Sequence, residues 1–141
     1  MRPLLVGESY RGGGLSPETA SGRRLCLVLR VSPDEYLEEY GRMNLCGLEW
    51  DAADARRAAG LVLLNAAYRT GSSDLVLFGR RVADSFGWVM GVGLDLLAAY
   101  HCGFVHIAVL PHPSGRCRLW SDRRTVRRAR RVLRDMRGGG G

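Results

Sequence analysis

Three loops of this sequence carry polar side chains that can take part in one reaction. Glu8 follows an apolar run near the start of the chain, Asn44 lies in a second short run, and His112 follows a third that ends at Leu110. A carboxylate can stabilise positive charge or activate water, and an imidazole can donate a hydrogen bond to a departing group. An amide can both donate and accept. The three loops are therefore candidates for one shared site.

These loops need a scaffold that brings them to one edge of the molecule. The short apolar runs typical of strands cover residues 3–6, 42–46, 74–78 and 106–110. Helical spacing predicts helices over 21–30, 34–40, 51–68, 80–86 and from residue 125 onward. Ser32 and Glu35 have the spacing of a capping box in front of the second helix. Because strands alternate with helices, we expect a three-layer α/β/α sandwich with a small, mainly parallel central sheet, which binds ligands beyond the carboxyl ends of its strands.

The length and composition fit one globular domain. The chain has 141 residues, of which 46% are hydrophobic, enough to bury a core. We expect residues 1–137 to form a single domain and the glycines 138–141 to be a flexible tail. No apolar run approaches the roughly 18 residues of a membrane span, and no signal peptide opens the chain. A monomeric cytoplasmic protein without a membrane partner is therefore expected.

Positive charge is concentrated at the end of the chain. All 21 basic residues are arginines; ten lie between residues 116 and 137, beside only Asp122 and Asp135. The first 115 residues hold twelve acids and eleven arginines. Codon bias would explain the absence of lysine, but it would not explain this concentration. A localised arginine excess is typical of a face that binds nucleic-acid phosphates, so DNA is the expected partner.

The cysteines and the remaining histidines indicate no metal or cofactor. Cys26, Cys46, Cys102 and Cys117 form no Cys-x-x-Cys pair and have no histidine at zinc-finger spacing. They predict neither a zinc site nor a disulfide framework, and buried thiols in a reducing compartment are expected. His101 and His106 are expected to be structural.

Three strings of the sequence resemble the uracil-DNA glycosylase superfamily. They are Leu-Leu-Val-Gly-Glu at 4–8, Leu-Val-Leu-Phe-Gly-Arg-Arg-Val-Ala at 75–83, and Leu-Pro-His-Pro-Ser-Gly at 110–115. Their order and spacing fit the superfamily over nearly the whole chain. The most specific element is the His-Pro-Ser-Gly turn followed by Arg116, Arg118 and Trp120. The resemblance implies the uracil-DNA glycosylase fold and a cofactor-independent enzyme that removes a base from DNA.

The resemblance also implies a role for each matching residue. Hydrolysis of an N-glycosidic bond builds positive charge on the sugar and negative charge on the base, so Glu8 and His112 are the catalytic candidates. A base inside a duplex must be rotated out before it can react. The candidates for binding that base are Ser9, Tyr10 and Asn44. The candidates for DNA binding and for bracing the vacated position are Pro113, Ser114, Gly115, Arg116 and Arg118.

Several alternatives stay open at the level of sequence. Ser9 stands where the uracil enzymes have an aspartate, so either Glu8 or a water held by the backbone drives hydrolysis. Asn65, in a Leu-Leu-Asn string, competes with Asn44 for reading the base. The substrate is uracil or a bulky phage-type base such as glucosylated hydroxymethylcytosine, which corresponds to a repair or an anti-phage role. The glycines at 12–14 either make room for the larger base or serve the turn. A catalytically silent, glycosylase-like DNA-binding module is the competing class.

Overall fold

The apolar runs of the sequence form one five-stranded sheet in a computed structural model, which describes residues 2–69, 73–114 and 116–138. The strands are β1 (Leu4–Gly7), β2 (Gly41–Asn44), β3 (Ser73–Phe78), β4 (Ala98–Cys102) and β5 (Val105–Leu110). They lie in the order β2-β1-β3-β5-β4, and every neighbouring pair is parallel except β4 with β5. The predicted mainly parallel sheet is confirmed.

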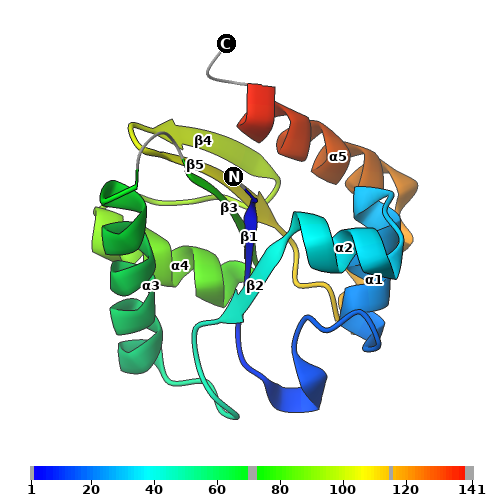
Figure 1. Cartoon of the computed structure of the whole chain (residues 1–141), viewed down its shortest axis with the longest axis horizontal. Helices are drawn as coiled ribbons and strands as arrows, with labels where there is room; N and C mark the ends of the chain where they lie inside the picture. Colours follow the sequence, from blue (N-terminus) through cyan, green and yellow to red (C-terminus); the bar gives the residue numbers. More distant parts are fainter. Residues whose placement is uncertain (1, 70–72, 115, 139–141) are drawn as a thin grey trace.

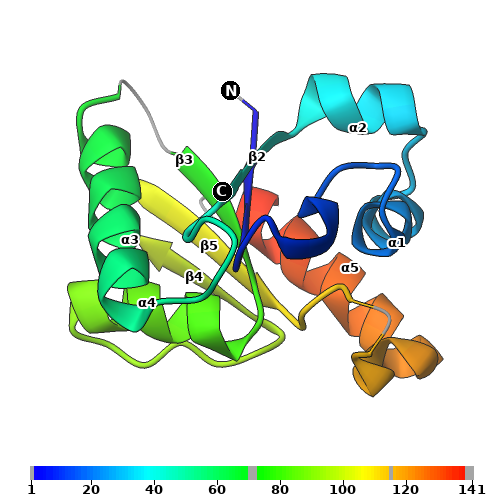
Figure 2. The same cartoon turned by 90° about the horizontal axis from the view of Figure 1, so that it is seen from below.

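Helices cover both faces of this sheet, so the three-layer sandwich is confirmed as well (Figure 1). The α-helices are α1 (Ala20–Leu29), α2 (Pro33–Glu39), α3 (Ala52–Ala67), α4 (Arg80–Met90) and α5 (Arg123–Gly138). Two 3₁₀ turns, η1 (Arg11–Gly13) and η2 (Arg118–Ser121), lie in loops. Figure 2 shows α3 and α4 on one side of the sheet and α1, α2 and α5 on the other. The predicted capping box of Ser32 and Glu35 starts α2.

The two faces of the sheet are both buried, which explains why the strands are continuous apolar runs rather than alternating ones. Towards α1, α2 and α5, the strands contribute Val76, Phe78, Ala108 and Leu110. Towards α3 and α4 they contribute Leu75, Leu77, Ile107 and Val109. Burial of these side chains on both faces fixes the register of β3 against β5, in which Phe78 is opposite Leu110.

The sheet reverses its winding direction at β1. The chain passes from β1 to β2 on one side and then returns to β3 on the other side of β1. In open α/β sheets such a switch point leaves a crevice beyond the carboxyl ends of the two central strands. The loops after β1 and β3 therefore border a natural binding site, and the loops after β2 and β5 flank it.

The structure differs from the sequence-based expectations at two places. The antiparallel edge strand β4 was not predicted, and Gly138 belongs to α5 rather than to the predicted tail, whose other residues, 139–141, lie outside the described part. Among the described residues, none of the helices combines the length and the apolar character that crossing a bilayer requires.

Candidate active site

A cavity of about 880 Å³ opens at the carboxyl ends of the parallel strands. It is bounded by the loops that follow β1, β2 and β5, by the first turn of α4 and by the start of α1. The predicted catalytic and base-binding residues that line it are Glu8, His112, Ser9 and Asn44. From the predicted DNA-binding turn, Pro113, Ser114 and Arg116 line it too. Seven of the ten predicted site residues are thus brought together.

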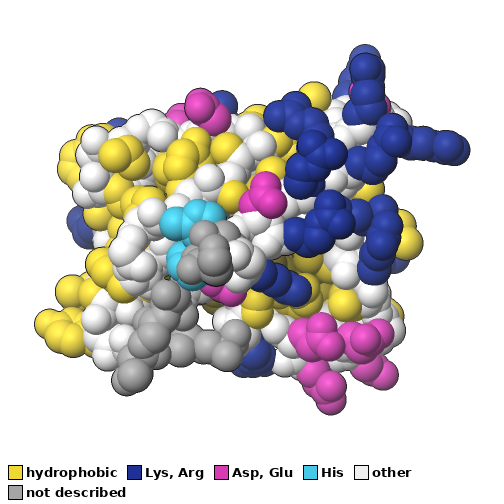
Figure 3. Space-filling view, turned by 90° about the horizontal axis from the view of Figure 1, so that it is seen from above, with side chains coloured by type: hydrophobic (Ala, Val, Ile, Leu, Met, Phe, Trp, Pro, Cys, Tyr) yellow, Lys and Arg dark blue, Asp and Glu magenta, His cyan; other side chains and the backbone are white. Residues whose placement is uncertain are grey.

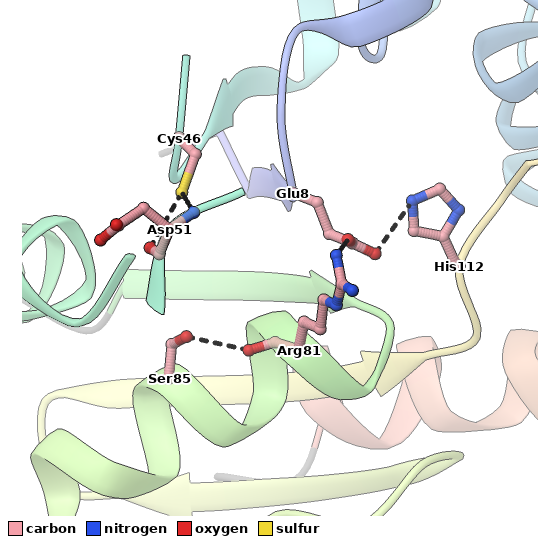
Figure 4. Close-up of polar contacts among 6 residues, drawn as sticks. All are labelled: Glu8, Cys46, Asp51, Arg81, Ser85 and His112. Carbon is pink, nitrogen blue, oxygen red and sulfur yellow. Dashed lines mark hydrogen bonds and ion pairs between the residues drawn. The ribbon is translucent and has the colours of Figure 1, made fainter. Parts of the chain in front are cut away.

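Glu8 and His112 contact each other directly in this cavity (Figure 4). The Oε2 atom of Glu8 lies 3.3 Å from Nε2 of His112. The other carboxylate oxygen, Oε1, lies 3.4 Å from a guanidinium nitrogen of Arg81, on the first turn of α4. Glu8 therefore joins an imidazole and a cation, and its side chain is only 22% exposed.

The hydrogen-bond network assigns the tautomer of His112. The backbone N–H of Ser114 donates to Nδ1 of the ring over 3.1 Å, so Nδ1 is an acceptor and carries no proton. In the neutral ring the proton then lies on Nε2, which faces the Glu8 carboxylate. His112 consequently presents a fixed N–H donor to the cavity, the group that a departing anion requires.

The turn that carries His112 is held from two sides. Trp120 belongs to η2 and is buried in the core, and its Nε1–H donates to the carbonyl of His112 over 2.9 Å. Arg24 on α1 donates to the carbonyl of Ser114 over 2.7 Å. These two bonds join the turn to both the core and α1, so the position of the imidazole is set by side chains outside the cavity.

Asn44 is placed by two glycines. It ends β2 with 9% of its surface exposed. A Cβ atom on Gly7 would lie 2.4 Å from its Oδ1, and a Cβ on Gly14 would lie 2.8 Å from its Nδ2. Both positions must stay free of a side chain for the amide to occupy this place.

The other glycines of the first loop serve the backbone. Gly13 and Gly14 have φ values of +90° and +61°, which side chains rarely tolerate. A Cβ on Gly13 would also lie 2.7 Å from Cγ2 of Thr19. Of the two interpretations of this stretch, the turn accounts for Gly13 and Gly14, and the volume they leave is used by Asn44 and Thr19.

Three of the predicted site residues are not among the described residues that line the cavity. Tyr10 is half exposed and lines a neighbouring hollow, which shares Asn44 and Leu15 with the main cavity. Arg118 is exposed at the start of η2, and Gly115 lies outside the described residues. Asn65, the competitor of Asn44, lies on α3 and lines a separate hollow near the beginnings of β1 and β3. The structure therefore brings Asn44 and not Asn65 to Glu8 and His112.

Sequence reasoning missed Arg81. Gly79 lies between β3 and α4, with φ +92°, and is the N-cap residue of α4. Because it has no side chain, His112 and Glu8 lie close to its backbone. A residue in the first turn of a helix after such a glycine points to the strand ends, and this was the available signal. The guanidinium of Arg81 also lies 5.6 Å from the ring centroid of Trp50, a cation–π contact at the cavity wall.

The charges around the cavity favour an anion. Its described lining holds Arg11, Arg81 and Arg116 against Glu8 and Glu49. Arg81 is engaged with Glu8, whereas Arg116 is exposed beside the His112 turn. Arg116 is therefore an exposed cation of the cavity lining.

The structure also locates the remaining titratable groups. Among the described residues there is no cluster of three or more His, Cys, Asp or Glu side chains able to hold a metal ion. The four cysteines are free thiols; Cys26 and Cys46 are buried, and burial raises the pKa of the Cys26 thiol. His106 pairs with Asp74 over 3.2 Å and stacks edge-on against His101, away from the described cavity lining.

Comparison with known proteins adds no family assignment: no protein-family model matches the sequence, and no curated protein matches it.

Proposed function

We propose that this chain is a DNA glycosylase that flips a nonstandard pyrimidine out of DNA and hydrolyses its N-glycosidic bond to leave an abasic site. The observation that carries the proposal is the Glu8–His112 pair, 3.3 Å apart, with the Nε2–H of His112 fixed as a donor inside a nucleotide-sized cavity. The resemblance of the three sequence strings supports the same activity.

In bond cleavage His112 acts on the departing base and Glu8 acts on the sugar. As the glycosidic bond lengthens, the base gains negative charge, and the His112 Nε2–H turns from Glu8 to an oxygen of the base. The Glu8 carboxylate then faces the cationic sugar and can accept a proton from the attacking water. Arg81 holds Glu8 in place during this exchange, because it contacts the oxygen that His112 does not.

Base binding and flipping use the rest of the site. The Asn44 amide can donate and accept against the edge of the extruded base. Ser114, which is partly exposed, enters the duplex, the buried Pro113 supports the turn behind it, and the exposed Arg116 contacts the flanking phosphate. Since the turn is braced by Trp120 and Arg24, it can fill the vacated position without folding back.

The cavity volume bears on the substrate. About 880 Å³ lies near the upper end of the range of roughly 300–1,000 Å³ for ligand pockets. This volume supports a bulky base such as glucosylated hydroxymethylcytosine as well as uracil. The glycines of the first loop do not discriminate, because they serve the turn and Asn44.

A second candidate function is a catalytically silent DNA-binding module. Both oxygens of Glu8 are engaged by Arg81 and His112, and Ser9 supplies no further carboxylate. In a silent module this network would only stabilise the turn. Release of a base from DNA distinguishes the two candidates, because only the glycosylase hydrolyses the N-glycosidic bond.

We further propose that the enzyme acts as a cytoplasmic monomer. One chain supplies Glu8, Arg81, Asn44 and His112 to a single cavity, so no second copy is needed to complete it. The free thiols suit a reducing compartment.

The decisive experiment is excision from DNA containing uracil, glucosylated hydroxymethylcytosine or neither, with abasic sites and released base as the readouts. We expect release from at least one modified DNA. His112→Ala should lower the single-turnover rate by about 10²–10³-fold, the usual effect of removing one transition-state donor. Its matched control, His101→Ala, removes a histidine outside the cavity and should keep the parental rate.

Glu8 is tested by the isosteric Glu8→Gln, paired with Glu49→Gln from the same cavity lining. Glu8→Gln should slow excision, whereas Glu49→Gln should not. Binding of all variants to plain duplex is measured in parallel. Parental binding without release of any base would favour the silent module, and a parental rate in His112→Ala would refute the assigned site.

A further inference from the structure

A second cavity, away from the active site, is lined by arginines. It lies between α1 and α5, and its volume is about 380 Å³. We call it the arginine groove and define it by six residues, Arg30, Arg127, Arg130, Arg131, Arg134 and Arg137. Its apolar floor comes from Val28, Leu29 and Leu133. No described residue lines both this groove and the active-site cavity.

The groove opens on a different face of the molecule from the active site. The helices α1 and α5 run antiparallel to the parallel strands, so both end near the edge of the sheet where these strands begin (Figure 1). The groove lies at this edge, and the strands run from it towards the active site. Figure 3 views that edge and shows arginine side chains gathered on one side of it, where α1 and α5 lie. A nucleotide held at His112 is therefore at the other end of the sheet.

The arginines of the groove form no ion pair within the described parts of the chain, although the charge of Arg127 contributes to lowering the pKa of Asp122. The described lining contains no acid, and no described carboxylate lies within ion-pair distance of Arg30, Arg127, Arg131 or Arg134. The guanidinium groups of these four arginines form no hydrogen bond or ion pair within the described part of the chain, and all four side chains are exposed. The groove therefore keeps free guanidinium groups on its rim.

The other two arginines, Arg130 and Arg137, are held by hydrogen bonds to the protein and form part of the wall of the groove. Arg130 donates from Nε to the carbonyl of Val28 and from a terminal nitrogen to that of Leu27, both over 3.0 Å. Arg137 donates to the hydroxyl of Tyr40. The pKa of Arg130 is lowered by burial and by the charge of Arg30, so the like charges are held together by the fold.

We infer that the arginine groove binds a second segment of DNA phosphate backbone, separate from the segment that carries the flipped nucleotide. The inference rests on the proposed function for the choice of DNA as the polyanion. A row of guanidinium groups with no carboxylate complements a chain of phosphates, and guanidinium groups bind phosphate oxygens in pairs. The chain then holds two DNA segments at once.

The test uses the double variant Arg127→Ala/Arg131→Ala and a matched control, Arg123→Ala/Arg128→Ala. The control removes the same charge from exposed positions of α5 outside the groove. Affinity for long plain duplex is measured against salt concentration. Each lost phosphate contact should reduce the slope of log K against log salt by about 0.9, so the groove variant should lose about 2 and the control less than half of that.

A second measurement addresses the two segments directly. The chain is mixed with a short single-stranded oligonucleotide that carries an abasic site, then with a plain duplex, and ternary complexes are counted by native mass spectrometry. The parental chain and the control variant should form them, and the groove variant should not. Excision from a short single-stranded substrate should be unchanged in the groove variant, which separates this inference from the proposed function.

The opposing outcomes are equally definite. Equal losses of slope in both double variants would overturn the inference in favour of a general charge effect, as would the absence of any ternary complex with the parental chain. Vesicles containing phosphatidylglycerol are the last arm. If the groove variant loses vesicle binding but keeps parental duplex binding, the groove serves a membrane surface and the inference is wrong. If excision fails altogether while groove-dependent duplex binding persists, only the proposed function fails.

Discussion

Replacing Gly7 with alanine tests how the fold places the Asn44 amide. The new Cβ would lie 2.4 Å from Oδ1 of Asn44, whereas ordinary contact begins at 3.4 Å, so the amide must move by about 1 Å. The Gly14 backbone adjoins the other end of the amide, which limits this movement. Overpacking of this kind costs about 1–3 kcal/mol, and we expect Gly7→Ala to lower the free energy of unfolding by about 2–3 kcal/mol.

The same change should cost much less once the amide is removed. In an Asn44→Ala background the clash with the amide is gone, and the added methyl lies 3.3 Å from side-chain atoms of Leu15. The two substitutions should therefore couple by about 1–2 kcal/mol, in the range measured for residues in contact. The assay is urea unfolding of the four proteins of the cycle, with the m-value checked for constancy.

Gly47→Ala is the matched control, because no atom lies within 4 Å of its added Cβ. It measures the gain of about 0.4–1 kcal/mol that alanine brings by restricting the unfolded chain. An equal cost of Gly7→Ala in both backgrounds, after this correction, would refute the placement of Asn44 against Gly7.

Two further predictions concern the His112 turn and the start of α5. Trp120→Phe removes the donor to the His112 carbonyl and should lower the free energy of unfolding by about 1–2 kcal/mol. The control Trp88→Phe, at an exposed position, should not lower it. Equal urea midpoints for the two variants would contradict this prediction. The pKa of Asp122 is lowered mainly by the backbone N–H of Arg124, so its stabilising effect is present above the ordinary aspartate pKa of about 3.9 and is lost as the pH falls through the lower folded value. Parental stability should therefore fall more between neutral and acidic pH than that of Asp122→Asn, and parallel curves by thermal unfolding would show that the carboxylate has no such role.

The sequence predicted the parts of the fold that depend on local patterns. The strand predicted at 106–110 is followed by Pro111 and Pro113, which cannot continue it, and it is observed as Val105–Leu110. The capping box fixes the start of α2. The edge strand β4 was missed because Ala-Ala-Tyr-His-Cys has neither alternation nor a β-branched residue. It exists because its backbone pairs with β5, with Tyr100 opposite Ile107, which is a tertiary effect.

The candidate site was predictable where a residue follows a strand directly. Glu8 follows β1, Asn44 is the last residue of β2, and His112 comes two residues after β5, so the parallel sheet brings all three to one edge. Arg81 pairs with Glu8 across 73 positions of sequence, and nothing local to either residue indicates this contact. Arg24 reaches Ser114 across 90 positions, so the brace of the turn needed the packing of α1 to be known.

Helix α1 sets a fixed distance between two distant features of the surface. Arg24, on its first half, holds the carbonyl of Ser114, while the carbonyls of Leu27 and Val28, at its end, receive Arg130 from α5. With a rise of 1.5 Å per residue, Arg24 lies about 4.5 Å from Leu27 and about 6 Å from Val28 along the helix axis. Helix α1 therefore fixes both the separation and the relative direction of the two attachment points. Four residues inserted between Arg24 and Leu27 would separate the His112 turn from the arginine groove by about 6 Å more and rotate one against the other by about 40°, because four residues exceed one turn of 3.6 residues.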